Sequence, residues 1–262
     1  MPRKLGQHFL TSGAVLDRIA DAVCPEREPL VIEIGPGRGA LTEKLLDRAA
    51  RVVVIEVDRE LVEYLRSRFD ASRLEVVHAD VLTVDLAQWG RAPIAGNLPY
   101  YITSPILEKA MRSAPPRAVF LIQKEVALRL AAKPGTRDYG YLTVQTAVWA
   151  STRILFDVKP GSFRPPPKVD SAVVLLEPRT TSLENRDEFL EFASRCFRQK
   201  RKTLRNNLLE FYPRELIESL PEASKRAEEL SLDQLLSAFI RVALRPEDFL
   251  NWPQMNNADK RR

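Results

Sequence analysis

The stretch PLVIEIGPGRGALTEKLLDR, residues 29–48, decides the fold of this chain of 262 residues. Residues 29–34 form a nearly continuous apolar run, which is typical of a strand buried on both faces of a parallel sheet. A turn rich in glycine follows at 35–39, and the leucines of residues 40–48 share one face of a predicted helix. A strand, a glycine-rich turn and a helix in this order predict the start of an α/β sheet.

The same alternation continues along the chain. We predict strands at 52–55, 74–77, 93–96 and 118–122, and helices at 58–69, 102–111 and 124–132. Strands that alternate with helices are joined by right-handed crossovers, which build a doubly wound sheet. Two further strands, at 153–158 and 171–176, are expected to form a hairpin-like end to this sheet.

The sequence changes character after Pro178. Residues 180–185 form a polar stretch with turn character, as in a linker, and the residues from 187 onward show helical patterns without a clear strand. We therefore predict two domains, an α/β domain over 1–180 and a small all-helical domain over 181–262.

The composition excludes several classes of protein. Hydrophobic residues make up 45% and charged residues 29% of the chain, as in ordinary globular proteins. No apolar run is long enough to span a membrane, and two cysteines are too few for a disulfide framework. No apolar segment follows the basic N-terminal residues, so we expect no secretory signal and a cytoplasmic protein. The net charge of +5 is by itself weak evidence for a polyanionic partner.

The glycine-rich turn predicts a cofactor site. Gly35 and Gly37 let the backbone approach a ligand closely, and Glu56 ends the next strand, where an acid can bind ribose hydroxyls. The pattern G-x-G-x-G differs from the dinucleotide fingerprint G-x-G-x-x-G and fits S-adenosylmethionine better, since that cofactor offers a ribose and a carboxylate. Asp80 follows the third strand, where it either accepts a hydrogen bond from an adenine amine or simply caps a helix. A tight turn without a ligand is the alternative for the whole motif.

The tetrapeptide Asn97-Leu98-Pro99-Tyr100 predicts the catalytic site, because it follows the fourth strand at the ligand-binding edge of the sheet. An Asn oxygen and a nearby backbone carbonyl can accept both hydrogens of an adenine amine, which favours a tetrahedral nitrogen. Proline fixes the backbone there, and the tyrosine ring can stack on a base. A plain strand-end turn is the alternative.

A proline-rich loop, 161–171, follows the predicted strand at 153–158. Its prolines favour a rigid, extended loop, which can hold Phe163 over the mouth of the site as the second face of a base clamp. Alternatively, Phe163 fastens the loop to the core.

Residues 195–205 predict a nucleic-acid surface. Six of these eleven residues are basic and none is acidic, while the predicted helical domain as a whole is nearly neutral. Such a concentration is typical of contacts with phosphates. A solvated helix face is the alternative, although a run without acids lacks the ion pairs that stabilise such a face. Cys196 shares an apolar helix face with two phenylalanines, so we expect packing there, and no metal site is expected anywhere.

Taken in order, these motifs resemble the ribosomal RNA small-subunit adenine N6,N6-dimethyltransferase family. The matching segments are Gly6–Leu10, Glu33–Gly39, Val54–Asp58, Gly96–Tyr100, Gln123–Glu125, Tyr139–Leu142, Phe163–Ser171 and Arg201–Asn207. Tyr101 departs from the pattern, because many relatives have Asn at that position.

The resemblance implies a Rossmann-like domain that uses S-adenosylmethionine, a small helical domain, and dimethylation of two adjacent adenosines near the 3′ end of small-subunit rRNA. It also implies an N-terminal segment that covers the cofactor. The expected cofactor residues are His8, Leu10, Gly35, Gly37, Glu56, Asp80 and Asn97. The expected catalytic residues are Asn97, Pro99, Tyr100 and Phe163. The expected RNA-binding residues are Arg164, Lys168, Arg195, Arg198, Lys200, Arg201, Lys202 and Arg205.

The expected partners are small-subunit rRNA and the immature small subunit, with no membrane and a monomeric enzyme. Three other functions remain to be weighed: methylation of large-subunit rRNA, a non-catalytic assembly or transcription factor, and a small-molecule methyltransferase. The segment 163–171 and the basic run at 201–207 favour the small-subunit enzyme over the first, and the intact tetrapeptide argues against the second. The third would not need the basic stretch.

Overall fold

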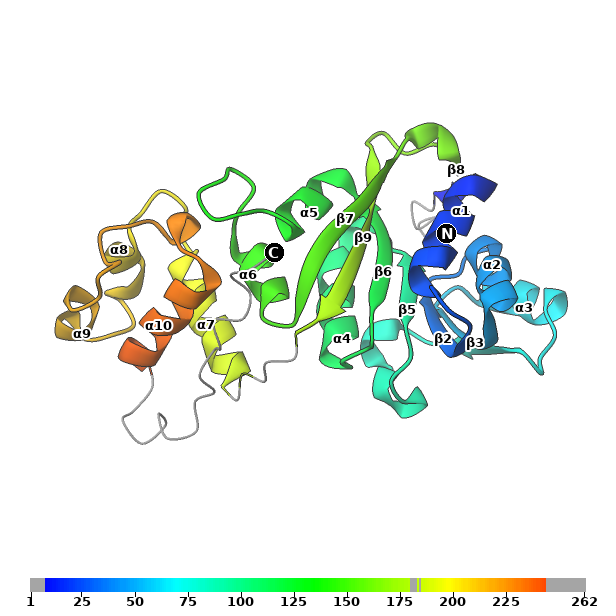
Figure 1. Ribbon diagram of the computed structural model, residues 1–262, viewed down its shortest axis with the longest axis horizontal. Helices are drawn as coiled ribbons and strands as arrows, with labels where there is room; N and C mark the ends of the chain where they lie inside the picture. Colours follow the sequence, from blue (N-terminus) through cyan, green and yellow to red (C-terminus); the bar gives the residue numbers. More distant parts are fainter. Residues whose placement is uncertain (1–7, 180–182, 184, 244–262) are drawn as a thin grey trace. The chain divides into compact units, whose positions relative to one another are not determined.

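The computed structural model describes residues 8–179, 183 and 185–243, which form two compact units (Figure 1). The first, here called the sheet unit, comprises the described residues up to Ala131 together with Trp149–Pro178. The second, the helical unit, comprises Ala132–Val148 together with the described residues from Arg179 onward. None of the described helices is long and apolar enough to cross a membrane.

The sheet unit is built on one seven-stranded sheet in the order β4-β3-β2-β5-β6-β9-β7. The strands are β2 (Glu28–Ile34), β3 (Ala49–Glu56), β4 (Leu74–His78), β5 (Ile94–Asn97), β6 (Ala118–Gln123), β7 (Ala150–Val158) and β9 (Ser171–Pro178). The first five strands of this order are parallel, and β9 pairs antiparallel with both β6 and β7. The predicted doubly wound α/β sheet and its hairpin-like end are confirmed.

Five helices accompany the sheet: α1 (Gly13–Val23), α2 (Ala40–Arg48), α3 (Arg59–Arg68), α4 (Thr103–Arg112) and α5 (Lys124–Leu130). Helix α3 begins where the sequence predicts it, because the carboxylate of Asp58 accepts hydrogen bonds from the backbone N–H groups of Glu60 and Leu61. Its inner face is formed by Val62 and Leu65, whereas Tyr64 is 42% exposed.

The sequence analysis did not identify α1, although this helix has a regular apolar face. Its buried residues, Leu16, Ile19, Ala20 and Val23, recur at the spacing of one helical face. On its polar side, Asp17 and Asp21 both accept hydrogen bonds from Arg48 of α2. These exposed ion pairs join α1 to α2 and contribute little, whereas the buried apolar face supplies most of the packing of α1.

The helical unit contains α6 (Tyr141–Ala147), α7 (Arg186–Cys196), α8 (Leu204–Leu208), α9 (Arg214–Glu218) and α10 (Leu232–Ala243). Its core is aromatic, since the ring of Phe239 packs on those of Phe189 and Phe192 with centroids 5.5 and 5.6 Å apart. Aromatic pairs at this separation are favourable beyond their buried area.

One segment lies in a different unit from the one that the sequence analysis assigned. Residues 132–148 were placed in the α/β domain but belong to the helical unit. The buried Tyr139 donates its hydroxyl hydrogen to the carbonyl of Leu230 at 2.8 Å, and the N–H of Gly135 donates to the carbonyl of Glu228 at 2.7 Å. These long-range hydrogen bonds, and not local propensity, decide where the segment packs.

The strand order places a switch point between β2 and β5. From β2 the chain proceeds outward through β3 and β4, and from β5 it proceeds outward on the other side through β6. Ligands of doubly wound sheets bind outside the carboxyl ends of the strands at such a point. Gly96 pairs with Ile34 there, and a Cβ atom on Gly96 would lie 2.6 Å from the carbonyl oxygen of Ile34.

We expect Gly96→Ala to lower the free energy of unfolding by about 1–3 kcal/mol, because an added methyl group must push apart two paired strands. Urea denaturation of the full chain, followed by circular dichroism, measures this change. Gly161→Ala is the matched control, since nothing lies within 4 Å of its added Cβ. Equal stability of the two variants would contradict the close approach of β5 to β2.

Candidate active site

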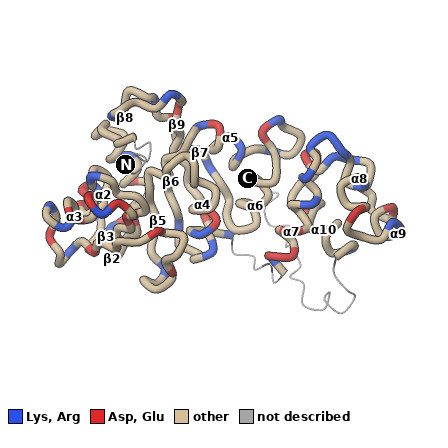
Figure 2. The backbone as a smooth tube through the Cα atoms, turned by 180° about the vertical axis from the view of Figure 1, so that it is seen from behind, with Lys and Arg blue, Asp and Glu red and all other residues tan. Residues whose placement is uncertain are grey.

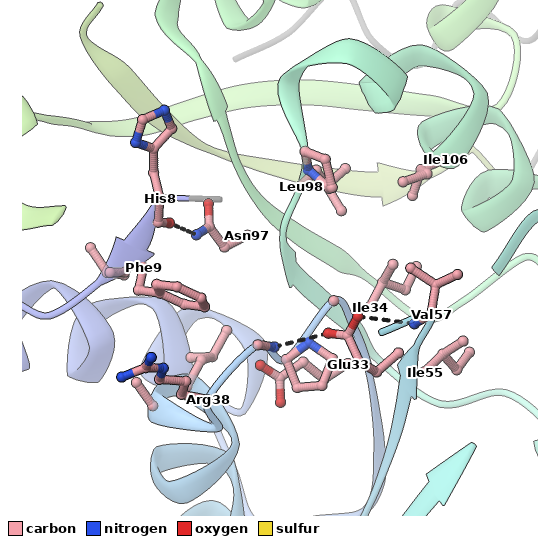
Figure 3. A pocket seen from close by; sticks show the side chains of 18 of the residues that line it. His8, Phe9, Glu33, Ile34, Arg38, Ile55, Val57, Asn97, Leu98 and Ile106 are labelled. Atoms are coloured by element: carbon pink, nitrogen blue, oxygen red, sulfur yellow. Dashed lines mark hydrogen bonds between the residues drawn. The ribbon is translucent and has the colours of Figure 1, made fainter. Parts of the chain in front are cut away.

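A cavity of about 820 Å³ opens at the carboxyl ends of β2, β3 and β5, at the switch point of the sheet (Figure 3). Its volume is in the usual range for a site that holds a small molecule or cofactor. Most of the lining comes from the segment 8–11, the glycine-rich turn with the start of α2, the end of β3, the turn after β4 and the tetrapeptide after β5, and residues of α1, α4 and the proline-rich loop complete it.

The glycine-rich turn has the backbone that its glycines predict. Gly37 and Gly39 have φ angles of +57° and +77°, which disfavour other residues. A Cβ on Gly39 would also lie 2.6 Å from the ring of Phe69, and one on Gly37 would lie 3.1 Å from the ring of Phe9. Gly35 and Gly37, both predicted cofactor residues, line the cavity.

Glu56 is fixed at the end of β3 by three backbone hydrogen bonds. Its carboxylate accepts from the N–H groups of Val57 at 2.9 Å, Asp58 at 3.0 Å and Gly37 at 3.2 Å. Burial raises the pKa of this carboxyl, while the three backbone donors act in the opposite direction. The predicted acid therefore lies in the cavity wall in one fixed orientation.

Glu33 is a second acid in the cavity, which the sequence analysis did not single out. Its side chain is 1% exposed and accepts a hydrogen bond from the hydroxyl of Thr42 at 2.6 Å. Burial is the main cause that raises its pKa to about 8, and the nearby charge of Glu56 raises it further. A sequence signal was available, since Glu33 is the one charged residue in the apolar run at 29–34.

Asn97 and Leu98 present two hydrogen-bond acceptors. The side-chain amide of Asn97 donates to the carbonyl of His8 at 3.1 Å (Figure 3), which leaves its Oδ1 as an acceptor. Among the described residues, neither this oxygen nor the carbonyl of Leu98 has a protein donor. The carbonyl of Pro99 differs, because it already accepts from the Thr103 hydroxyl and the Ile102 N–H.

Tyr100 lies beside these acceptors and is half-buried. Its hydroxyl is 2.7 Å from the hydroxyl of Ser171, and its ring stacks against that of His8 with centroids 6.1 Å apart and an angle of 30°. Burial raises the pKa of the phenol, so Tyr100 is neutral at physiological pH. The next residue, Tyr101, also lines the cavity but is 69% exposed.

The segment at 8–11 borders the cavity through pairing with the proline-rich loop. Strand β1 (Phe9–Leu10) pairs antiparallel with β8 (Phe163–Arg164), with Leu10 opposite Phe163. His8 Nδ1 lies 2.8 Å from the carbonyl oxygen of Pro165. His8 and Leu10, predicted cofactor residues, therefore both line the cavity.

Asp80 caps a helix, which is one of the two roles predicted for it, and it also borders the cavity. One carboxylate oxygen accepts from the N–H of Leu82 at 3.0 Å and so caps the short 3₁₀ helix Val81–Thr83. The same residue is exposed and lines the cavity, where the second carboxylate oxygen has no donor among the described residues.

The structure contradicts the prediction that Phe163 forms one face of a base clamp. Its side chain is 0% exposed, belongs to the apolar core with Leu10, and does not line the cavity. The alternative, that Phe163 fastens the proline-rich loop to the core, is the one that fits. Burying a large aromatic ring in the core removes apolar area from water, which lowers the free energy of the folded state relative to an exposed ring.

Four of the six basic residues in 195–205 have acidic partners, which corrects the premise that this run lacks ion pairs. Arg195 pairs with Glu191, Arg198 with Glu210, Lys200 with Glu228 and Arg205 with Glu218. All four of these acids lie outside the run, so the composition of the run alone could not reveal them.

Arg201 and Lys202 remain exposed, without an acidic partner among the described residues, on the turn between α7 and α8 (Figure 2). Two basic residues that were not predicted, Lys225 and Arg226, lie beside this turn. The carbonyl of Lys225 accepts a hydrogen bond from the N–H of Leu204, and the backbone of Arg226 forms an antiparallel β-bridge with that of Thr203. In the sheet unit, Arg164 and Lys168 are exposed as well, and Arg164 lines the cavity.

Cys196 is fully buried in the helical unit, and burial raises the pKa of its thiol, as expected of a packing residue. Within the described part of the chain, no three His, Cys, Asp or Glu side chains are grouped so that they could hold a metal ion.

A sheet of this order, with its ligand cavity at the β2–β5 switch point, belongs to the Rossmann-like methyltransferases, which take their methyl group from S-adenosylmethionine. The family model for ribosomal RNA adenine dimethylase matches residues 1–244. The chain therefore belongs to the ribosomal RNA adenine dimethylase family.

Individual relatives agree with this assignment. A ribosomal RNA small subunit methyltransferase A from Acidobacterium capsulatum is 44% identical over 248 residues, covering 88% of this chain and 88% of the relative. The protein of that name from Prosthecochloris aestuarii is 41% identical and covers 92% of this chain and 93% of the relative.

Two solved structures are similar over most of the chain. A dimethyladenosine transferase from Plasmodium falciparum has a TM-score of 0.77 at 29% identity and covers 89% of this chain and 96% of that one. The 23S rRNA methyltransferase ErmE has a TM-score of 0.70 at 29% identity, with coverage of 90% and 100%.

We expect the buried Glu33 carboxyl to make stability fall as pH rises. The unfolded chain releases this proton near pH 4.5 and the folded chain near pH 8, so the folded state binds more protons between these values. The free energy of unfolding should therefore decrease across this window, at most by about 1.4 kcal/mol per pH unit.

Urea denaturation at pH 5, 6.5 and 8 measures this decrease. Glu33→Gln should flatten the profile relative to wild type, whereas Glu26→Gln, which changes an exposed glutamate, should leave it unchanged. A Glu33→Gln profile as steep as that of wild type would show that Glu33 is not the group responsible.

Proposed function

We propose that this enzyme transfers methyl groups from S-adenosylmethionine to the N6 amines of two adjacent adenosines near the 3′ end of small-subunit rRNA. The observation that carries this proposal is the pair of unpaired acceptors, Asn97 Oδ1 and the Leu98 carbonyl, at the rim of the cavity. The names of the relatives, small-subunit rRNA methyltransferases, favour this substrate over large-subunit rRNA.

Residues on one side of the cavity would hold the cofactor. Glu56 has its orientation fixed for ribose hydroxyls, and the buried Glu33 carboxyl lies in the wall of the same side. The free carboxylate oxygen of Asp80 suits the adenine amine, and the backbone of the glycine-rich turn suits the cofactor's carboxylate. When bound, S-adenosylmethionine supplies an activated methyl group on a sulfonium.

Residues on the other side would hold the target amine. An adenine amine is a weak nucleophile because its lone pair is delocalised into the ring. Two acceptors, Asn97 Oδ1 and the Leu98 carbonyl, can bind its two hydrogens and leave the lone pair to attack the methyl group. Positioning of this kind accounts for much of the rate when the leaving group is already activated.

The acids that line the described cavity, Glu33, Glu56 and Asp80, all come from β2, β3 and the turn after β4, away from the tetrapeptide. None of them is hydrogen-bonded to Asn97. We therefore infer that no side chain acts as general base and that the nitrogen loses its proton to solvent after methylation. Tyr100 would stack on the extruded base, which offsets the cost of unstacking it.

Asn97→Ala is expected to lower turnover by at least about 100- to 1,000-fold, the usual cost of removing one fixed catalytic hydrogen-bonding group. Affinity for S-adenosylmethionine should change far less. The measurement is primer extension on under-methylated small subunits, where dimethyladenosine stops the polymerase at a readable position.

Wild-type enzyme should give two adjacent stops near the 3′ end of the small-subunit rRNA. Stops in large-subunit rRNA, or none, would overturn the proposed substrate. Gln88→Ala is the matched control, since it removes an exposed amide side chain that does not line the cavity. Asn97→Ala must fall well below this control.

We propose that Arg201 and Lys202 bind RNA phosphates, with an immature small subunit as the particle recognised by a monomeric, cytoplasmic enzyme. Both side chains are exposed and lack described acidic partners, so they are available to an RNA backbone. Arg195, Arg198, Lys200 and Arg205 contribute more weakly, because each must share its charge with a carboxylate.

The double variant Arg201→Ala with Lys202→Ala should bind under-methylated subunits more weakly. The slope of log affinity against log salt should become shallower by about 1.4, since each lost contact with single-stranded phosphate contributes about 0.7. Filter binding over a salt series gives this slope. Arg214→Ala, which removes an exposed cation paired with Glu218, is the control and should leave the slope unchanged.

A further inference from the structure

Beside the acceptors of the tetrapeptide, the cavity has the half-buried ring of Tyr100, on which a base could stack. One side of Tyr100 faces His8, with which its ring stacks. Phe163, the candidate for the opposite side, is fully buried in the core. An RNA strand with one extruded base must also place the neighbouring base somewhere, and bases that leave a stack are generally received by aromatic rings.

Tyr101 is an exposed aromatic residue at the cavity, and its side chain makes no polar or ring contact with the described protein. It is 69% exposed, the highest value among the large hydrophobic side chains that are described as exposed. It lines the cavity, yet its ring and hydroxyl have no hydrogen bond or ring partner among the described residues. Tyr100, immediately before it, has both.

The backbone of Tyr101 is nevertheless held firmly. Tyr101 is the central residue of the 3₁₀ helix Tyr100–Ile102, which begins after Pro99, whose φ angle is −61°. The carbonyl of Pro99 accepts hydrogen bonds from the Ile102 N–H at 3.2 Å and from the Thr103 hydroxyl at 3.1 Å. An exposed ring on a fixed backbone loses little entropy when it is covered by a ligand.

We propose that Tyr101 is a stacking platform for the base next to the adenosine that is being methylated. The inference rests on the proposed function, because it requires an RNA strand with its target base in the cavity. The exposure of Tyr101 places its ring at the rim, outside the buried part of the cavity, where the adjacent nucleotide of the same strand would lie. Tyr101 thus acts on RNA binding and not on the cofactor.

Stacking accepts any base because every base has a π face. Tyr101 would therefore hold the neighbouring nucleotide by contact with its ring, without selecting one base by a specific hydrogen bond.

The test compares Tyr101→Leu with Tyr101→Phe on under-methylated small subunits, with kcat and KM for the subunit measured separately. Removal of the ring in Tyr101→Leu should raise KM by about 5- to 150-fold, the usual effect of one lost stacked base, while Tyr101→Phe stays close to wild type. Affinity for S-adenosylmethionine, measured by calorimetry, should be equal in all three proteins.

The matched control is Tyr64→Leu, which removes a 42% exposed tyrosine on α3 that does not line the cavity. An unchanged KM in Tyr101→Leu, with active wild-type enzyme, would overturn the inference and leave the proposed function intact. Equal loss in Tyr101→Phe would replace stacking by a hydroxyl contact, and loss of cofactor affinity would assign Tyr101 to the cofactor side. An inactive wild-type enzyme would instead refute the proposed function itself.

Discussion

The parallel pairing of β2 with β5 is the contact on which the rest of the site depends. It brings the glycine-rich turn at the end of one strand beside the tetrapeptide at the end of the other, so that the cofactor side and the amine side meet. Gly96 permits this pairing, because any side chain there would meet the carbonyl oxygen of Ile34. Gly96, which has no reactive side chain, thus determines how closely the cofactor side and the amine side of the cavity approach each other.

Periodicity in the sequence was sufficient to predict the strands and helices of the central sheet. Each has a strong local pattern, and the apolar run at 29–34 needs a parallel sheet on both sides. Helix α1 was missed although its apolar residues recur at helical spacing, and the segment 132–148 was misplaced because its hydrogen bonds, such as that from Tyr139 to Leu230, join residues far apart in the chain. Sequence patterns do not carry such pairings.

The same limit applies to the site. The positions of Glu56 and Asn97 follow from the rule that strand ends carry ligand-binding groups, and the structure places both at the cavity. The burial of Phe163 and the ion pairs of the basic run were not predicted, because exposure and ion pairing are properties of the folded surface. The sequence around Phe163 is the same whether its ring is exposed or buried. Likewise, the sequence around Arg205 does not indicate that Glu218 is its ion-pair partner.

The hydrogen bond between the Asn97 amide and the His8 carbonyl couples two walls of the cavity. The segment at 8–11 lines the cavity, and its backbone also orients the amide group after β5. A substitution that shifts the backbone at His8 would therefore disturb Asn97 as well, even though the two residues are 89 positions apart in the sequence.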